Sequence, residues 1–313
     1  MRVTNVSGCM KLRVMMAWIP LLLLVLSGCD STTKEPAFEE AETGTMNGSI
    51  MHDGMERTYI LYVPASYSSE EAMPLVLNFH GYTGNASEQM GYGDFRPIAD
   101  TAGFIVVHPQ GSLLAGETHW NVGGWTLEST TDDVGFTEAL LDSISAVYNI
   151  DQTKIYSTGM SNGGYMSFLL ACQMSERFAA IASVTGSMTP ETFNDCRPGK
   201  SMPVMQIHGT SDNVVPYTGA GWTRSIEDVL DYWINVNGCN ATVVRTDLTD
   251  SNMQDGSTVD HHTYGCEAEA AVEHFEVAGG GHTWPGSVPG GAGTNQDINA
   301  SAEIWTFFSR YGE

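Results

Sequence analysis

Short strand-like segments alternate with amphipathic segments along most of the chain. Most of the strand-like segments are rich in Val, Ile, Leu and Phe, and they cover 74–79, 104–108, 154–158, 180–184, 204–208 and 272–277. Between them, apolar residues recur at helical spacing over 132–148, 162–174, 226–236 and 301–311, as in helices with one buried face. A hairpin is predicted over 48–63, around Asp53-Gly54. Because strands and helices alternate, we predict one α/β domain over 47–313 with a mainly parallel central sheet flanked by helices.

The first 28 residues have a different pattern. Basic residues precede an apolar run at 14–26, which is too short for a comfortable membrane span and is typical of a secretory signal. The run ends in Leu26-Ser27-Gly28-Cys29, which resembles the signal motif of bacterial lipoproteins; an ordinary signal peptide with a chance cysteine is the alternative. We predict export and lipid anchoring at the bacterial cell envelope, on its periplasmic or extracellular face. The predicted segments are a lipoprotein signal peptide over 1–28, a lipidated Cys29 and a flexible tether over 29–46.

The charge of the chain narrows the classes of function. It contains 13 Lys+Arg and 37 Asp+Glu, a formal net charge of −24 over 313 residues. Such a surface repels phosphate backbones and anionic lipid, which excludes nucleic-acid binding through a basic patch and leaves the lipid anchor as the expected membrane contact. Hydrophobic residues make up 42% of the chain, enough for a sizeable core, so the charge does not indicate disorder. The sequence does not indicate an oligomeric state.

The cysteines agree with export. Six are present, and when those of the leader and anchor are set aside, the remaining ones allow three connectivities. Their order along the chain suggests the pairs Cys172–Cys196 and Cys239–Cys266; free buried thiols are the alternative, which is less favoured outside the cytosol. No C-x-x-C pair or cluster with zinc spacing occurs. We predict no metal and no other cofactor.

A serine motif lies where a strand-like segment gives way to a helix. Gly159-Met160-Ser161-Asn162-Gly163 fits the pattern G-x-S-x-G, in which small residues allow a sharp turn that exposes a nucleophilic serine. The helix N-terminus behind the serine favours developing negative charge. A glycine-rich loop without chemistry is the alternative, but the position between strand and helix favours Ser161 as a nucleophile.

An acid and a base follow at the ends of later strand-like segments. Asp212 lies just after 204–208, and His282 lies just after 272–277. A serine hydroxyl needs a base, and the order nucleophile, acid, base is that of the α/β-hydrolase triad. The alternatives are an ordinary turn residue for Asp212 and an ordinary loop histidine for His282. His208, beside Asp212, is the second candidate for the base.

A further turn is a candidate oxyanion hole. His80-Gly81-Tyr82 follows the strand-like segment 74–79, and in hydrolases of this type such a turn presents one backbone N–H to the tetrahedral oxyanion. Gly81 and Tyr82 are both candidates for this donor, and Asn162, directly after the nucleophile, is the candidate for the second. His80 is interpreted as a structural residue, because it precedes the serine and the order would be wrong for the base.

Together these motifs resemble those of the polyhydroxybutyrate depolymerase-like esterases, which are related to the feruloyl and acetylxylan esterases of carbohydrate esterase family 1. The resemblance covers roughly the whole predicted domain and rests on the segments 132–136, 159–164, 208–212 and 279–286. It implies an α/β-hydrolase fold and a serine esterase with Ser161 as nucleophile, Asp212 as acid and His282 as base. It also supports the two cysteine pairs.

The loops indicate the kind of ester. The segment 186–202 is too short for a large lid, and an open cleft suits a bulky or polymer-linked ester. Trp120 and Trp125, in the long connection 110–131, and Trp284 are predicted to line this cleft; simple packing of the loops is the alternative. We predict a serine carboxylesterase acting on feruloyl or acetyl esters of plant polysaccharides, or on related aromatic esters. The alternative is a polyhydroxyalkanoate depolymerase, and a peptidase or a non-catalytic binding protein is less favoured.

Overall fold

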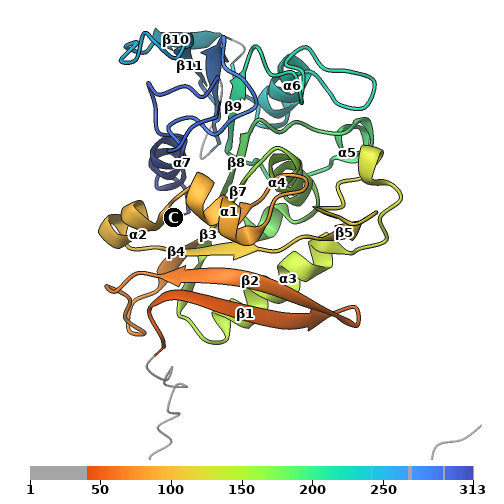
Figure 1. The fold of residues 1–313 in the computed structure, drawn as a ribbon, viewed down its shortest axis with the longest axis vertical. Coiled ribbons are helices and arrows are strands. Elements are labelled where there is room, and N and C mark those ends of the chain that lie inside the picture. The colour runs from red at the N-terminus through yellow and green to blue at the C-terminus, as the bar shows by residue number, and fades with distance from the viewer. Residues whose placement is uncertain (1–40, 241, 267–269, 292, 313) are drawn as a thin grey trace, which may run out of the picture. The chain divides into compact units, whose positions relative to one another are not determined.

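The computed structural model describes residues 41–240, 242–266, 270–291 and 293–312. The predicted signal peptide and Cys29 lie outside these residues. Within them, ten strands form one sheet in the order β1-β2-β4-β3-β7-β8-β9-β12-β11-β10 (Figure 1). The strands from β4 to β12 in this order are parallel, and antiparallel strands complete both edges. The predicted α/β fold with a mainly parallel sheet is confirmed.

The elements have the following bounds. The strands of the large sheet are β1 Gly44–His52, β2 Met55–Val63, β3 Met73–Phe79, β4 Ile105–Pro109, β7 Ile150–Met160, β8 Ala180–Val184, β9 Val204–Gly209, β10 Val243–Asp247, β11 Thr258–Tyr264 and β12 Val272–Ala278. A separate small sheet pairs β5 Ser112–Leu114 with β6 Glu117–His119. The helices are α1 Ala86–Tyr92, α2 Arg96–Ala102, α3 Asp133–Ser145, α4 Asn162–Gln173, α5 Pro190–Asp195, α6 Ile226–Val236 and α7 Ala300–Phe308, with short 3₁₀ turns η1 Gly124–Thr126 and η2 Ser175–Arg177.

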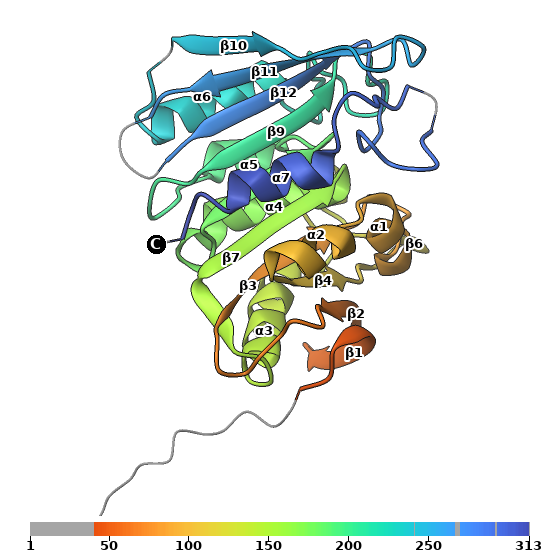
Figure 2. The same ribbon diagram turned by 90° about the vertical axis from the view of Figure 1, so that its left-hand side faces the viewer.

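Apolar side chains form two core layers, one on each face of the sheet. Successive strand residues point to opposite faces, and in β4 Ile105 and Val107 join one layer whereas Val106 joins the other. The first layer includes side chains of α3, α4 and α6, and the second includes side chains of α2 and α7. Figure 2 shows α2 and α7 on the near face of the sheet. Burial on both faces explains why the central strands are almost continuously apolar in sequence.

The predicted hairpin is present, but its first strand begins earlier than expected. β1 pairs antiparallel with β2, and the turn residues Asp53 and Gly54 have φ values of 48° and 76°, as a two-residue hairpin turn requires. Gly44 already pairs with Val63. The last residues of the predicted tether 29–46 therefore belong to the sheet.

The sequence pattern missed short helices and one sheet edge. α1 and α2 have seven residues each, too few to show a helical period. Every residue of β10 is exposed, so this strand is held by its pairing with β11 and has no apolar face to mark it. In the segment 186–202, all of which is described, the only helix is the six-residue α5, which agrees with the prediction that a large lid is missing.

Two disulfides join the predicted cysteine pairs. Cys172–Cys196 links α4 to the residue directly after α5, and Cys239–Cys266 links the segments after α6 and β11. They close loops with sequence separations of 24 and 27 residues. In the chain-entropy account, each such cross-link stabilises the fold by roughly 3 kcal/mol.

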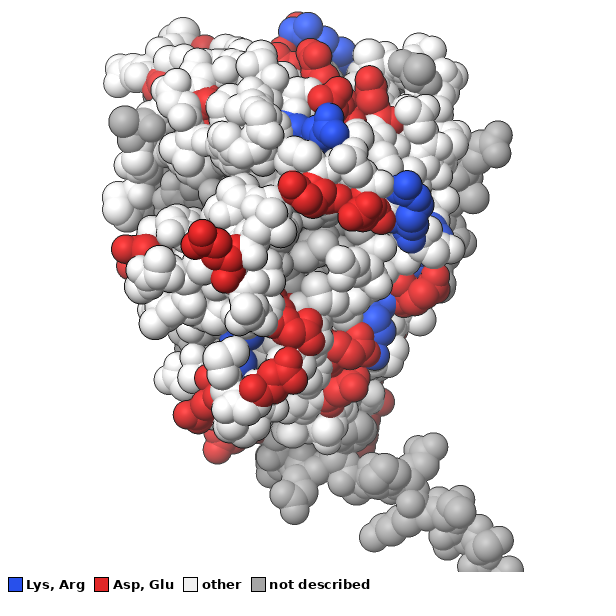
Figure 3. Space-filling model, turned by 90° about the vertical axis from the view of Figure 1, so that its right-hand side faces the viewer, with Lys and Arg blue, Asp and Glu red and all other residues white. Residues whose placement is uncertain are grey.

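In the described ranges, almost all acidic residues are exposed or partly exposed. They are spread over the face shown in Figure 3 and do not gather in one patch. Among the described residues only Asp133, Asp212 and Glu273 are buried carboxylates, and each contacts a basic or imidazole group. In the described part of the chain, no helix combines the length and the apolar character needed to cross a bilayer.

Candidate active site

Ser161 lies at the sharp turn between β7 and α4. Its φ is 52° and its ψ is −120°, a strained conformation that a non-glycine residue rarely adopts. Hydrogen bonds hold the turn on both sides: the Ser161 N–H donates to the Val184 carbonyl over 2.8 Å, and the Ser161 carbonyl accepts from the Tyr165 N–H over 3.0 Å. The turn therefore presents Ser161 at the wall of a cavity at the carboxyl end of β7.

Glycines on either side of Ser161 allow backbones to pass very close together. A Cβ on Gly159 would lie 2.6 Å from the carbonyl of Gly163, and a Cβ on Gly163 would lie 2.8 Å from the carbonyl oxygen of His80. Real Cβ atoms do not tolerate such contacts, so α4 can pack against β3 and β7 only if both positions are glycine. This packing is the physical reason for the spacing of the G-x-S-x-G motif.

Asp212 lies in the loop after β9 and is fully provided with hydrogen-bond donors. Its Oδ1 accepts from the N–H groups of Val214 and Val215 over 2.8 and 2.9 Å, and its Oδ2 lies 2.7 Å from His282 Nδ1. Burial by itself raises the pKa of this carboxyl, but hydrogen bonds from His208 and His282 outweigh it and hold the pKa well below the usual range. Asp212 is therefore a carboxylate at neutral pH.

His282 lies in the glycine-rich loop after β12. Among the described residues, Asp212 is the only hydrogen-bond partner of the His282 ring. Nδ1–H therefore donates to the carboxylate, and Nε2 has no hydrogen-bond partner among these residues. His282 and Ser161 line the same cavity, which has a volume of about 600 Å³. The fold thus brings Ser161, Asp212 and His282 together from loops that follow three parallel strands.

The loop after β3 runs directly beside Ser161. A Cβ on Gly81 would lie 3.4 Å from the Ser161 Cβ and 3.9 Å from its Oγ. The Gly81 carbonyl accepts from the Gly84 N–H over 3.0 Å and lies 2.7 Å from His80 Nδ1. Because the C=O and N–H of a trans peptide point in opposite directions, the Tyr82 N–H faces away from these partners. The Asn162 N–H is at the start of α4, where no intrahelical acceptor exists.

His80 supports this loop and is almost completely buried. It is 1% exposed, and its Nε2 accepts from the Gly111 N–H over 2.9 Å. A backbone N–H can only donate, so the ring proton is on Nδ1 and points to the Gly81 carbonyl. Burial lowers the pKa of His80 to about 4, and the ring is neutral. His80 thus has the structural role that the order of the motifs indicated.

Trp120 does not line the cavity, and this prediction was wrong. Its side chain is 0% exposed and packs edge-on against Phe79 with ring centres 5.0 Å apart. The indole Nε1–H donates to the His80 carbonyl over 2.9 Å, and the Trp120 backbone exchanges two hydrogen bonds with the Asn162 side chain, of 2.7 and 3.1 Å. Trp120 is therefore a buried brace between the Ser161 turn and the loop after β3.

Trp284 is also buried, contrary to the prediction that it lines the cleft. It is 1% exposed, and its Nε1–H donates to Ser301 Oγ on α7 over 3.2 Å. Its own backbone N–H donates to the Tyr92 hydroxyl over 3.1 Å. These bonds anchor the His282 loop to α1 and α7. The ring itself is buried because a large apolar surface is more stable in the core than in water.

Trp125 is not among the described residues that line the cavity either, contrary to the prediction. It is half-buried and belongs to a surface feature that the sequence did not reveal. Its ring contacts Tyr82 edge-on at 5.7 Å and Trp222 at 6.5 Å between ring centres. Tyr82 is 41% exposed and Trp222 is 39% exposed, and Tyr82 also lines the cavity beside Ser161. We call Tyr82, Trp125 and Trp222 the aromatic row. Trp222 carries no local signal in sequence, because only folding brings its loop next to Trp125.

His208, the second candidate for the base, is in the wrong place for that role. It is 0% exposed and does not line the cavity with Ser161. Its Nε2 lies 2.9 Å from the Val215 carbonyl and 3.4 Å from Asp212 Oδ2. His208 is therefore enclosed behind the acid, whereas His282 faces the cavity.

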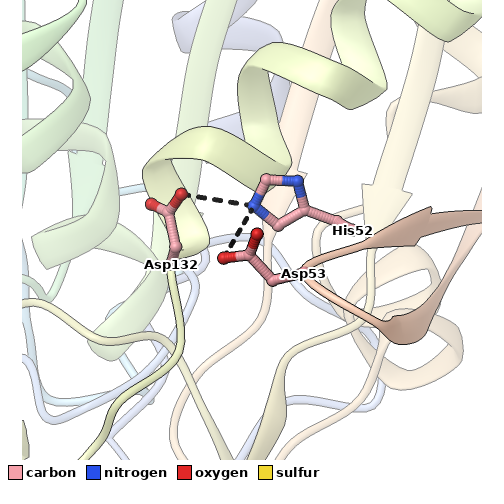
Figure 4. A group of neighbouring side chains, drawn as sticks. All are labelled: His52, Asp53 and Asp132. Atoms are coloured by element: carbon pink, nitrogen blue, oxygen red, sulfur yellow. Dashed lines mark hydrogen bonds and ion pairs between the residues drawn. The ribbon is translucent and has the colours of Figure 1, made fainter.

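One group of possible metal ligands lies away from this cavity, at the start of α3 (Figure 4). His52 Nε2 is 3.2 Å from Asp132 Oδ2 and 3.8 Å from Asp53 Oδ2. Asp132 also caps α3, since its Oδ1 accepts from the Gly135 N–H over 2.9 Å. Both aspartates are exposed, and the positive end of a helix dipole opposes a cation. The three side chains join the β1–β2 turn to α3.

Three buried histidines make the fold sensitive to acid. Burial lowers the pKa of His80 to about 4 and that of His108 and His274 to about 3. Below pH 6.5 the unfolded chain binds protons on these histidines and the folded chain does not, so the free energy of unfolding falls as the pH drops. We expect a loss of about 2 kcal/mol per histidine between pH 7 and pH 5, measured by urea unfolding.

His108→Leu is the control for this prediction. Neither nitrogen of the fully buried His108 ring has a hydrogen-bond partner among the described residues, so removing the ring breaks no such bond. Between pH 7 and pH 5, the free energy of unfolding of the variant should fall by about 2 kcal/mol less than that of the original protein. Equal free energies of unfolding at the two pH values in the original protein would contradict the prediction.

Comparison with known proteins supplies a family context for this geometry. The sequence model described as Esterase PHB depolymerase matches residues 57–246. The chain is 25% identical over 268 residues to the bifunctional acetylxylan esterase/xylanase XynS20E of Neocallimastix patriciarum, a match that covers 85% of this chain and 35% of that protein. It is 27% identical over 263 residues to a probable feruloyl esterase C of Aspergillus clavatus, covering 84% of this chain and 86% of that one.

The chain therefore spans about a third of the first of these relatives and most of the second. Among solved structures, the acetyl xylan esterase from Aspergillus awamori superposes with a TM-score of 0.60 at 16% identity, covering 85% of this chain and 99% of that one. At this identity the likeness shows the fold alone. That fold is the α/β-hydrolase fold implied by the resemblance in sequence.

Proposed function

Because the chain belongs to the Esterase PHB depolymerase family, we propose that it is a serine carboxylesterase in which Ser161 is the nucleophile, His282 the base and Asp212 the acid. The observation that carries the proposal is the 2.7 Å contact between Asp212 and His282 beside a cavity that Ser161 also lines. Perturbed carboxylates in direct contact with a cavity-lining histidine are typical of catalytic sites.

In the proposed reaction, the Ser161 oxygen attacks the carbonyl carbon of the ester while His282 Nε2 accepts its proton. The C–O bond to the alcohol then breaks, and His282 returns the proton to the departing alkoxide oxygen. Water attacks the acyl-enzyme in the second half, with His282 again accepting a proton and passing it to Ser161. Asp212 keeps the ring oriented and stabilises its charged form through Nδ1–H.

We place the oxyanion between the N–H groups of Asn162 and Tyr82. The Asn162 N–H lies at the start of α4, where the helix dipole adds a favourable potential. The Tyr82 N–H is favoured over that of Gly81, because the carbonyl of the same peptide is held on the opposite side by His80 and Gly84. His80 thereby fixes the direction in which Tyr82 donates.

The surroundings of Ser161 favour an uncharged aromatic or polymer-linked ester. The cavity wall includes Tyr82, Tyr92, Met160 and Pro289, and Glu88 is the only carboxylate among the lining residues that the structure describes. No Lys or Arg is among the described lining residues, so no guanidinium or ammonium group there pairs with a free carboxylate. A volume of about 600 Å³ is within the usual range for a small-molecule site. The proposed substrates are feruloyl or acetyl esters of plant polysaccharides, or related aromatic esters.

A panel of esters tests this proposal. We expect turnover of methyl ferulate or acetylated xylan by the purified chain, and little or none by Ser161→Ala. Turnover of polyhydroxybutyrate alone would replace the proposed substrate by a polyester, the alternative that the family description allows. Cleavage of casein but of no ester would identify a peptidase, and inactivity on every substrate would contradict catalysis altogether.

The aromatic row leads from the cavity across the surface and is the proposed contact for the larger part of the substrate. Trp222→Ala should therefore lower kcat/KM more for a feruloylated oligosaccharide than for p-nitrophenyl acetate. We expect a difference of about 3- to 10-fold, the value of one aromatic contact. Leu127→Ala is the control, because Leu127 is 68% exposed and is not part of the row. Equal losses on both substrates would contradict the assignment.

We also propose that the chain is exported and carries lipid on Cys29, ahead of a catalytic domain that begins with β1 at Gly44. Two disulfides support export, since such bonds persist in oxidising compartments. The lipid anchor rests on the sequence motif alone, because Cys29 lies outside the described residues. Labelled palmitate supplied to a bacterial host should appear in the original chain and be lost in Cys29→Ser. Equal labelling of both chains would contradict the anchor.

A further inference from the structure

A polar cluster lies buried behind Asp212, on residues to which the proposed reaction gives no role. His208 and Gln206 are both 0% exposed and lie on β9, two residues apart. His208 Nε2 is 2.9 Å from the Val215 carbonyl and 3.4 Å from Asp212 Oδ2. The Val215 N–H in turn donates to Asp212 Oδ1 over 2.9 Å. His208 therefore contacts the acid directly and also the loop residue that holds it.

Gln206 determines which nitrogen of His208 carries the proton. The Gln206 Nε2 amide lies 2.9 Å from the Gly186 carbonyl and 2.9 Å from His208 Nδ1. A carbonyl accepts only, so this end of the side chain is the NH₂ group, and its second hydrogen points to Nδ1. His208 Nδ1 is then an acceptor, and the single ring proton is on Nε2, where it faces Val215 and Asp212.

The same amide links the acid to the nucleophile turn. Gly186, whose carbonyl accepts from Gln206, packs against Gly164 on α4 so closely that a Cβ on Gly186 would lie 2.7 Å from the Gly164 Cα. Gly164 follows Ser161 by three residues in the first turn of α4. A continuous set of buried contacts thus runs from α4 through Gly186, Gln206 and His208 to Asp212.

We propose that His208 and Gln206 are positioning residues, which set the place and orientation of the Asp212 carboxylate relative to Ser161 and thereby align His282. This inference rests on the proposed serine esterase function. Hydrogen bonds inside a dry core are stiff and costly to break, and small displacements of catalytic groups cost large factors in rate. Neither residue touches the substrate.

Three substitutions of His208 separate positioning from simple packing. His208→Leu removes both ring nitrogens, and His208→Asn keeps an acceptor for Gln206 but has no donor that reaches Val215 and Asp212. His208→Gln restores an N–H donor near the place of Nε2. On p-nitrophenyl acetate we expect kcat to fall about 10- to 100-fold in the Leu and Asn variants, with KM little changed. The Gln variant should stay within about threefold of the original kcat.

Spectroscopy of the original chain tests the same inference without a variant. In ¹⁵N-labelled protein, His208 should show an unprotonated Nδ1 and a protonated Nε2, and a proton on Nδ1 would overturn the proposal. The far-downfield ¹H signal of the His282 Nδ1–H should shift in the Leu and Asn variants and return towards its original position in the Gln variant.

Ser161→Ala and His108→Leu are measured alongside as controls. If the original chain shows no esterase activity that depends on Ser161, the proposed function fails. If that activity is present and His208→Leu and His208→Asn keep the original kcat, the positioning role is wrong while the function stands. Equal loss in the Leu, Asn and Gln variants would also overturn it, because packing and not the N–H donor would then matter. His108→Leu, which removes another fully buried histidine, should keep the original kcat.

Discussion

Replacing Ser161 with alanine is expected to lower kcat for p-nitrophenyl acetate by about 10⁴-fold or more, as loss of the nucleophile does in enzymes of this chemistry. Ser161 is the hydroxyl that the strained turn presents to the cavity, and the turn itself depends on backbone contacts that alanine preserves. The variant should therefore fold with an unchanged urea midpoint. The loss would then lie in the chemical step and not in stability.

Ser167→Ala provides a matched control on the same helix. Ser167 is buried and its Oγ is 2.9 Å from Ser157 Oγ, away from the cavity lining. Ser167 Oγ also donates to the Gly163 carbonyl over 3.2 Å. We expect kcat to stay within a few fold of the original, because each of these two bonds is a neutral hydrogen bond of modest net value. A Ser161→Ala protein that keeps a tenth or more of the original kcat would show that another group is the nucleophile.

Replacing Asp212 with asparagine is expected to lower kcat by about 10⁴-fold, the known cost of this exchange in a serine–histidine–aspartate triad. The amide has nearly the shape of the carboxylate, but it is neutral and one of its two ends can only donate. Oδ1 accepts from two backbone N–H groups, so the amide oxygen will occupy that side and the NH₂ group will face His282. His282 is then forced to accept at Nδ1 and to carry its proton on Nε2, where it cannot act as a base.

Asp132→Asn is the control for the removal of a carboxylate charge. Asp132 is an exposed N-cap, and asparagine caps a helix about as well as aspartate does. We expect no loss of kcat and only a small change in stability. If Asp212→Asn retained the original kcat, the carboxylate would not be the acid, and another buried carboxylate, Asp133 or Glu273, would have to be considered.

The parts of the fold that sequence predicted are those in which local pattern and tertiary environment agree. The central strands are buried on both faces and so appear as apolar runs, and α4 and α6 were predicted within one or two residues of their observed bounds. α1, α2 and β10 were missed because nothing in their own residues marks them: the helices are short, and β10 is exposed along its whole length.

The same distinction applies to the candidate site. Ser161, Asp212 and His282 could be named from sequence because each directly follows a predicted strand, and parallel strands bring their carboxyl ends to one edge of a sheet. The tryptophans could not be assigned in this way. Trp120 lies in the same connection as Trp125, yet Trp120 is fully buried whereas Trp125 is half-buried, and Trp284, in another glycine-rich loop, is fully buried as well. Whether an aromatic ring meets solvent or core depends on which distant segments cover it.

Sequence by itself therefore determined the order of the elements, the serine motif at a strand-to-helix turn and the acid and histidine that follow later strands. These depend on local steric requirements and on hydrophobic periodicity, which neighbouring residues encode. Only the tertiary structure decided that His208 lies behind Asp212 and not in the cavity, that Tyr82, Trp125 and Trp222 meet, and that Gln206 links the acid to α4. Each of these contacts joins residues whose mutual distance is set by the pairing of strands and the packing of helices, and no local pattern specifies that distance.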